Sequence, residues 1–208
     1  MIAKIKSVVR RYGVWGVMQN LAAKCLAKIG LRIHRMWILS HALDEGVVAN
    51  QLPAFEALSL ADFEAHRADD PAWFTERKMA QLARSFKVPA TRAFGCFVEG
   101  RLVSYGFTSE RYMGYSHRRL EEGDGYLWDD YTHPAHRGEG WHGVMIRIRE
   151  EVLRQAGKRR SVSIVSHFNR ASYRGFRRVG YTLLERYSYG KRWGKPFMTM
   201  RYGIAPKK

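Results

Sequence analysis

The sequence contains few cysteines, no long apolar run and, over its first 43 residues, no acidic side chain. Its 208 residues include only two cysteines, Cys25 and Cys96. They have no metal-ligand spacing and are too few for a disulfide framework, so they indicate free thiols in a reducing compartment. The most apolar segment, 14–31, is interrupted by two amides and two lysines. It is therefore not expected to span a membrane, which takes roughly 18 or more consecutive apolar residues.

Positive charge, in contrast, is abundant and unevenly spread. The formal net charge is +17 at pH 7. Residues 1–43 contain eight Lys and Arg and no acid, residues 44–146 contain eleven basic and sixteen acidic side chains, and residues 147–201 contain fifteen and three. Such an excess favours nucleic acid, anionic lipid, an acidic protein or a phosphate-rich cofactor as partner. The alternative is a solvated basic face that binds nothing.

The apolar spacing of residues 2–29 predicts a basic amphipathic helix in two pieces, with Trp15 among its apolar residues. This pattern is typical of a segment that lies on an anionic membrane surface, a contact expected through residues 1–30. Docking on its own domain, or on a second subunit in a homodimer, is the open alternative. We expect a cytoplasmic protein, with the inner face of the membrane as the alternative location.

Periodicity and turn signals divide the chain into an N-terminal arm with an extra strand, residues 1–50, and a main domain, residues 51–208. Strands are predicted at residues 35–43, 54–58, 93–98, 102–108, 126–132, 161–166, 181–189 and 197–202. Helices are predicted at residues 59–67, 71–86, 138–156 and 171–179. This order combines hairpins with strand–helix–strand crossovers, so we expect an α/β (α+β) fold with a mixed sheet.

The segment Thr132–Gly143, THPAHRGEGWHG, connects a predicted strand to a predicted helix. The first N–H groups of a helix have no partner within the helix, and the helix dipole is positive there. Glycines let such a turn approach a phosphate without a side-chain clash, and Arg137 adds positive charge. The segment therefore predicts an anion site.

The same segment resembles the coenzyme A signature of the GNAT acyltransferases. In that signature Arg or Gln is followed by two residues, Gly, one residue, and Gly or Ala, and Arg137 and Gly140 match it. Asn169, followed eleven and twelve residues later by Gly180 and Tyr181, resembles a second block of the family. The resemblance covers residues 54–202. It implies a mixed, splayed central sheet with helices on both faces.

What the resemblance implies for function is an N-acyltransferase that uses acyl-coenzyme A, acetyl-CoA above all, as co-substrate and an amine as acceptor. Backbone N–H groups would hold the pyrophosphate, the strand ending at Thr132 would bind pantetheine, and the acceptor would approach from the opposite side. The implied cofactor-binding residues are Thr132, His133, Arg137, Gly138, Glu139, Gly140, Trp141, His142, Gly143, Asn169 and Phe176. No metal is implied, since no His pair has metal-ligand spacing.

Two residues depart from the family pattern. His142 replaces a small residue, and it would either add charge near a phosphate when protonated or lie on the outer side of the first helical turn. Phe176 stands where many members have a tyrosine that protonates the leaving thiolate. Tyr173, three residues earlier and nearly on the same helix face, would substitute for it or only pack.

The proton acceptor is predicted on the strand before the turn. Strand alternation would place Tyr126, Trp128 and Asp130 on the side of Thr132, and Asp129 on the other side with Tyr131. Asp130 is therefore the first candidate for the base and Asp129 the second, with acceptor binding as the alternative role for both.

The acceptor itself is not predicted, although the basic arm favours a cell-envelope or lipid-linked amine. The motifs have no Cys or Ser nucleophile beside them, so we expect direct transfer without an acyl-enzyme. The alternative is a non-catalytic module whose basic faces hold nucleic acid or an acidic partner such as acyl carrier protein. Nucleic acid ranks low because no nucleic-acid-binding motif is present.

Overall fold

The computed structural model describes Met18, Ala22 and residues 25–43, 52–111, 119–193 and 195–203. Most of the predicted N-terminal helix, and most of the connector after the first strand, lie outside the described residues. Met18, Ala22 and residues 25–28 are helical. The chain divides into two compact units, one formed by residues 41–163 and the other by residues 1–40 together with 164–208. The two are described separately below.

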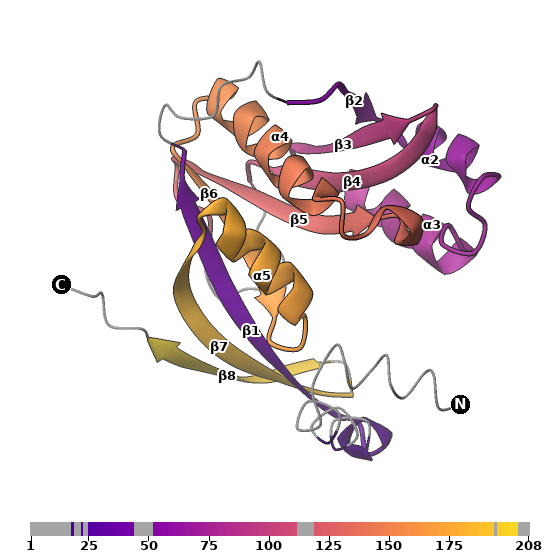
Figure 1. Cartoon of the computed structure of the whole chain (residues 1–208). Coiled ribbons are helices and arrows are strands. Elements are labelled where there is room, and N and C mark those ends of the chain that lie inside the picture. Colours follow the sequence, from indigo (N-terminus) through magenta and orange to yellow (C-terminus); the bar gives the residue numbers. More distant parts are fainter. Residues whose placement is uncertain are drawn as a thin grey trace. The chain divides into compact units, whose positions relative to one another are not determined.

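The unit of residues 41–163 is built on a mixed sheet (Figure 1). Its strands are β2 (Phe55–Leu58), β3 (Thr91–Val98), β4 (Arg101–Ser109), β5 (Asp124–Thr132) and the beginning of β6 (Arg160–Ser166), in this spatial order. Neighbours from β2 to β5 pair antiparallel, and β6 pairs parallel to β5. The β3–β4 hairpin turns at Glu99 and Gly100, which both have positive φ, as a tight two-residue turn requires.

Helices cover both faces of this sheet (Figure 1). On one face lie α2 (Leu60–Arg67) and α3 (Glu76–Phe86), which pack in one hydrophobic cluster with side chains of β4 and β5. On the other face lies α4 (Trp141–Gln155), which packs in a second cluster with β3 and β4. Ser59 caps α2 with a complete capping box, as its place before the helix predicts.

Two predicted helix starts were wrong. The helix predicted from Pro71 begins at Glu76, because the Thr75 hydroxyl accepts a hydrogen bond from the Lys78 N–H and caps it there. The helix predicted from Gly138 begins at Trp141, after a short 3₁₀ turn at Pro134–His136. In both cases proline or glycine marks the approach to the helix rather than its first turn.

The second unit contains β1 (Leu31–Ala42), whose last two residues belong to the first unit, α5 (Arg170–Val179), β7 (Thr182–Arg192) and β8 (Lys195–Gly203). Strand β7 pairs antiparallel with both β1 and β8. Gly180, at φ +110°, ends α5 as predicted. No helix among the described residues is both long and apolar enough to cross a membrane.

Candidate active site

The glycine turn before α4 exposes its backbone. Gly138 and Gly140 adopt φ of +98° and +90°, and a Cβ added at either would meet no atom within 4 Å. Within the described part of the chain, the N–H groups from Gly138 to Trp141 donate no hydrogen bond. The N–H of Gly143 donates to the Gly140 carbonyl at 2.9 Å, so its predicted role as a pyrophosphate donor is not supported. The backbone of residues 138–141 is therefore open where β5 leads into α4, an arrangement that suits an anion.

Side chains of the turn are held by their neighbours. The Glu139 carboxylate accepts a hydrogen bond from Trp141 Nε1 at 3.0 Å and lies 3.1 Å from His136 Nδ1. These contacts, the first from Trp141, lower the pKa of Glu139 and keep it negative. Arg137 Nε donates to the Thr132 carbonyl at 3.2 Å, so this guanidinium lies at the end of β5.

Strand β5 has no partner on its β6 side beside the turn. Its pairing with β6 runs from Asp124↔Arg160 to Leu127↔Ser163, whereas β5 itself continues to Thr132 and stays paired with β4. The last five residues of β5 thus extend beyond the pairing with β6. Backbone groups in such a stretch are suited to hydrogen bonding an extended ligand.

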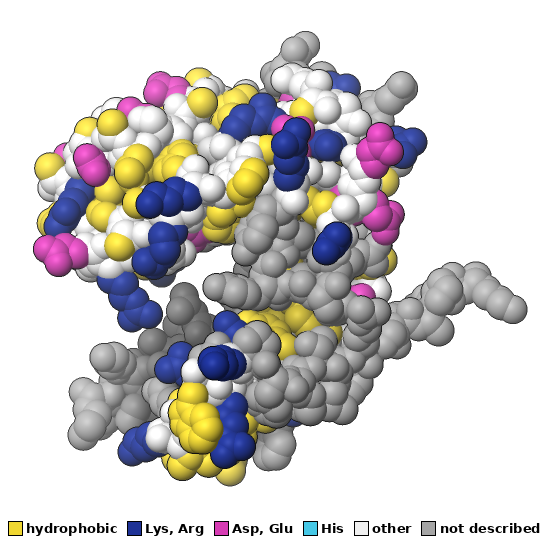
Figure 2. Space-filling model, turned by 180° about the vertical axis from the view of Figure 1, so that it is seen from behind, with side chains coloured by type: hydrophobic (Ala, Val, Ile, Leu, Met, Phe, Trp, Pro, Cys, Tyr) yellow, Lys and Arg dark blue, Asp and Glu magenta, His cyan; other side chains and the backbone are white. Residues whose placement is uncertain are grey.

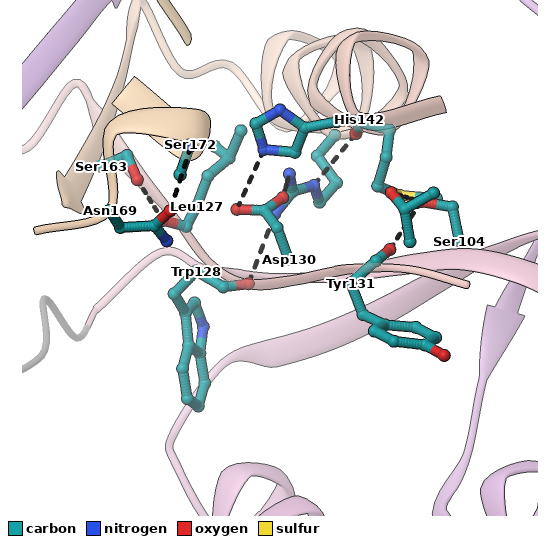
Figure 3. Close-up of polar contacts among 12 residues, drawn as sticks. Ser104, Leu127, Trp128, Asp130, Tyr131, His142, Ser163, Asn169 and Ser172 are labelled. Carbon is teal, nitrogen blue, oxygen red and sulfur yellow. Dashed lines mark hydrogen bonds and ion pairs between the residues drawn. The ribbon is translucent and has the colours of Figure 1, made fainter. Parts of the chain in front are cut away.

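A bulge in β5 separates its two adjacent carboxylates. Asp129 has φ +50°, and the pairing of β5 with β4 shifts register nearby. Lys78 Nζ of α3 lies 3.0 Å from both oxygens of Asp129, and Gln81 Nε2 lies 3.3 Å from one of them. Asp130 points the other way, toward α4 (Figure 3). The two carboxylates therefore lie on opposite faces of the sheet.

The bulge also corrects the predicted alternation. Trp128 packs with the cluster beneath α3, and the Tyr126 ring is stacked parallel to it. The prediction that both share the side of Asp130 was therefore wrong. Figure 3 shows Trp128 and Tyr131 below β5 and Asp130 above it. Asp129 and Tyr131 do lie on the same side, as predicted. One inserted residue accounts for both outcomes, because it moves every later side chain out of phase.

Arg149 of α4 is fully buried and binds Asp130. Its Nη2 donates to Asp130 Oδ1, its Nη1 donates to the Phe107 and Trp128 carbonyls at 3.1 and 3.4 Å, and its Nε donates to the Met145 carbonyl at 3.0 Å. A buried guanidinium is tolerated only with such complete pairing. The sequence does not single out this residue, because only tertiary packing determines that its charge is buried.

Gly106 of β4 makes room for this guanidinium, because a Cβ there would lie 2.6 Å from the Arg149 Cζ. Gly106→Ala should therefore lower the free energy of unfolding by about 1–3 kcal/mol, measured by urea denaturation. Removing the guanidinium removes the clash, so the loss should shrink in an Arg149→Met background. Equal losses in both backgrounds would contradict this explanation.

His142 lies in the first turn of α4 with its Nε2 4.0 Å from Asp130 Oδ2 (Figure 3). Its ring therefore points toward the sheet, and the prediction that it lies on the outer side of the turn was wrong. Burial, and to a smaller extent the Arg149 charge, lower the pKa of His142, while Asp130 opposes them. The neutral ring is thus favoured at pH 7, which argues against the alternative in which a protonated His142 adds charge near a phosphate.

A second group of polar side chains lies on the α3 face, beside Asp129. The Tyr131 hydroxyl donates to Asp70 Oδ2 at 3.1 Å, and His133 Nε2 lies 3.4 Å from the same oxygen. Trp73 stacks on Tyr131 with ring centroids 4.3 Å apart. Neither Asp70 nor Lys78 was predicted as a site residue. Asp70 precedes α3 and Lys78 lies in it, so both are far from the glycine motif in the sequence.

The other unit holds the remaining predicted residues. Asn169 caps α5, its Oδ1 accepting from the Ser172 N–H at 3.2 Å. Tyr173 packs on Trp37 with ring centroids 4.2 Å apart. Phe176 is fully buried against Tyr181, so its ring belongs to the core, and its contact with the cofactor stays a prediction. The roles of Asn169 and Tyr173 stay predictions.

Among the described residues, no group of three or more His, Cys, Asp or Glu side chains could hold a metal ion.

The family described as Acetyltransferase (GNAT) family matches residues 54–181 of the chain. A comparison with curated proteins found no match.

Three solved structures illustrate the likeness in fold. An acetyltransferase described as of the GNAT family from Novosphingobium aromaticivorans has TM-score 0.54 and 15% identity, with 78% of this chain and 66% of that chain covered. A GNAT-family acetyltransferase from Colwellia psychrerythraea gives 0.53 and 14%, with 83% and 61% covered. The aminoglycoside 6′-N-acetyltransferase from Acinetobacter haemolyticus gives 0.50 and 16%, with 62% and 91% covered. The chain thus spans less than two thirds of the first two proteins.

Proposed function

The chain belongs to the GNAT acetyltransferase family, and from this premise we propose that it transfers an acyl group, acetyl above all, from acyl-coenzyme A to an amine. The observation that carries the proposal is the open backbone of residues 138–141 where β5 leads into α4. Backbone N–H groups and the positive end of a helix together suit a pyrophosphate. The thioester supplies the acyl carbonyl and a thiolate leaving group.

The cofactor would then lie along the glycine turn and the end of β5. The N–H groups from Gly138 to Trp141 would hold the pyrophosphate, and the stretch of β5 that ends at Thr132 would bind pantetheine. Arg137 lies beside the Thr132 carbonyl, and so its charge is available near the phosphates. The negative Glu139 opposes this attraction, which favours release of the product coenzyme.

Asp129, rather than Asp130, is the carboxylate that we assign to the acceptor amine. Asp129 and Asp130 are both ion-paired, but Asp130 faces α4 and holds the fully buried Arg149, so we assign Asp130 a positioning role beside the cofactor turn. Asp129 lies on the opposite face of the sheet. The family resemblance implies that the acceptor approaches from that side. There it would attract the ammonium group and accept the proton that the amine loses on attack.

Transfer would be direct from thioester to amine. Tyr173 is proposed as the group that protonates the departing thiolate, with Tyr173→Phe as its test. The acceptor would be a cell-envelope or lipid-linked amine, modified in the cytoplasm at the inner face of the membrane. The basic character of the chain supports an anionic environment for that substrate.

Acetyl-CoA binding tests the proposed function first. Millimolar acetyl-CoA should raise the Tm by several degrees, because a ligand that binds only the folded state stabilises it. Gly140→Val should abolish that rise, since a β-branched residue cannot adopt φ +90° and its side chain would obstruct the turn. Gly157→Val, at φ +76° and outside the turn, is the matched control and should keep the rise.

A screen for thiol release from acetyl-CoA with amines, amino sugars and basic peptides would then identify the acceptor. Failure of acetyl-CoA to raise the Tm would overturn the enzyme assignment and favour the non-catalytic module.

A further inference from the structure

All of the net positive charge lies in one of the two units. The unit of residues 1–40 and 164–208 contains nineteen Lys and Arg and one acid, Glu185, whereas residues 41–163 contain seventeen Lys and Arg and eighteen acids. The formal charges are thus +18 and −1. This division is unrelated to the proposed active-site residues of β5 and α4, which belong to the nearly neutral unit.

The same unit exposes large apolar side chains at one end of the β1–β7 pair. Ile29, Ile33 and Trp193 are 67%, 40% and 72% exposed. Trp193 closes against Gly30, donating its N–H to the Gly30 carbonyl at 2.8 Å. Ile33 pairs across the strands with Gly190, which has no side chain to cover it. The apolar groups are therefore held outward by folded backbone.

Each of these apolar residues has an exposed cation next to it in the sequence. Lys28, Arg32 and Arg192 are all exposed, and the Arg192 guanidinium lies 4.4 Å from the centroid of the Trp193 ring. We call these three cations with Ile29, Ile33 and Trp193 the β1–β7 tip. Glu185 pairs with Ile38, well along the strands from the tip. Figure 2 shows hydrophobic side chains flanked by Lys and Arg in this lower part of the surface.

We propose that the β1–β7 tip docks on an anionic membrane surface. An exposed Trp and two Ile side chains can enter the boundary between headgroups and acyl chains, while the cations bind lipid phosphates. Single-stranded nucleic acid would use stacking on aromatic rings, but two of the three exposed apolar side chains are aliphatic and offer no ring. The inference extends the membrane contact expected for residues 1–30 to the described strands, and it does not depend on acetyltransferase activity.

Sedimentation of the full chain with vesicles tests this surface. The protein should bind phosphatidylcholine vesicles that contain about a quarter phosphatidylglycerol, but not pure phosphatidylcholine, and raised salt should weaken the binding. Arg32→Gln with Arg192→Gln should weaken it about 25-fold, given about fivefold for each cation. Ile29→Ser with Trp193→Ser should weaken it about tenfold.

Matched controls are available in the other unit. Arg101→Gln and Phe55→Ser alter exposed side chains of β4 and β2 and should change vesicle binding less than twofold. Losses as large in these controls, or wild-type binding by the tip variants, would overturn the proposal. The proposal would also be overturned if the protein bound a single-stranded oligonucleotide more tightly than vesicles and the Ile29→Ser, Trp193→Ser variant bound vesicles as well as the wild type. Circular dichroism would show that each variant is folded, and the acetyl-CoA response would report separately on the proposed function.

Discussion

Arg149→Met should lower the free energy of unfolding by about 3–5 kcal/mol, the largest stability effect expected of a single substitution in this chain. The guanidinium is fully buried, and its loss would leave the Phe107 and Trp128 carbonyls with fewer donors and Asp130 without its cation. Methionine has a similar length, so little of the loss would come from a cavity. Urea denaturation followed by circular dichroism would measure it.

Arg147→Met is the control for this substitution, because Arg147 lies on the exposed side of the same helix. Its effect should stay within about 0.5 kcal/mol. Adding Asp130→Asn to Arg149→Met should restore part of the stability, since the second change removes the stranded carboxylate charge. A loss below about 1 kcal/mol for Arg149→Met would show that the pairing contributes little.

Asp129→Asn should lower kcat at least about 100-fold, as expected for loss of a proton acceptor. Asparagine has the same shape and tolerates the left-handed backbone at φ +50°, so the bulge should survive. The rise in Tm caused by acetyl-CoA should therefore be unchanged. The measurement is the rate of thiol release with an acceptor found in the amine screen.

Asp130→Asn is the matched comparison, because it makes the same chemical change one residue along the strand. We expect a smaller loss of kcat and a clear loss of stability, since Asp130 pairs with the buried Arg149. Should Asp130→Asn instead abolish turnover while Asp129→Asn leaves it intact, the base would be Asp130, as the sequence alone predicts.

Local signals predicted much of the fold. The strands predicted at residues 93–98 and 102–108 pair as the β3–β4 hairpin, and the helix predicted at 171–179 matches α5, which ends before Gly180. The start of α3 was missed because Pro71 and Thr75 both suit a helix start, and only the structure shows which one caps it. Periodicity cannot decide between two acceptable caps so close together.

The candidate site was predicted less completely, because its key contacts join distant segments. The glycine turn between β5 and α4 lies within one motif, so it was predicted from the sequence, and its role in binding the cofactor stays a prediction. The bulge at Asp129 was not, because alternation assumes one residue per step and contains no signal for an insertion. Arg149 reaches Asp130 from the next helix, and only tertiary packing determines that its charge is buried.

The bulge has a consequence for how such a strand can diverge. In a regular strand, side chains two residues apart share a face, so a change in one alters the surroundings of the other. At the bulge, neighbouring residues face opposite sides of the sheet and contact different side chains: Asp129 contacts Lys78, and Asp130 contacts Arg149. On the proposed assignment, a substitution at Asp129 would therefore alter acceptor binding without changing the surroundings of Asp130 beside the acyl donor.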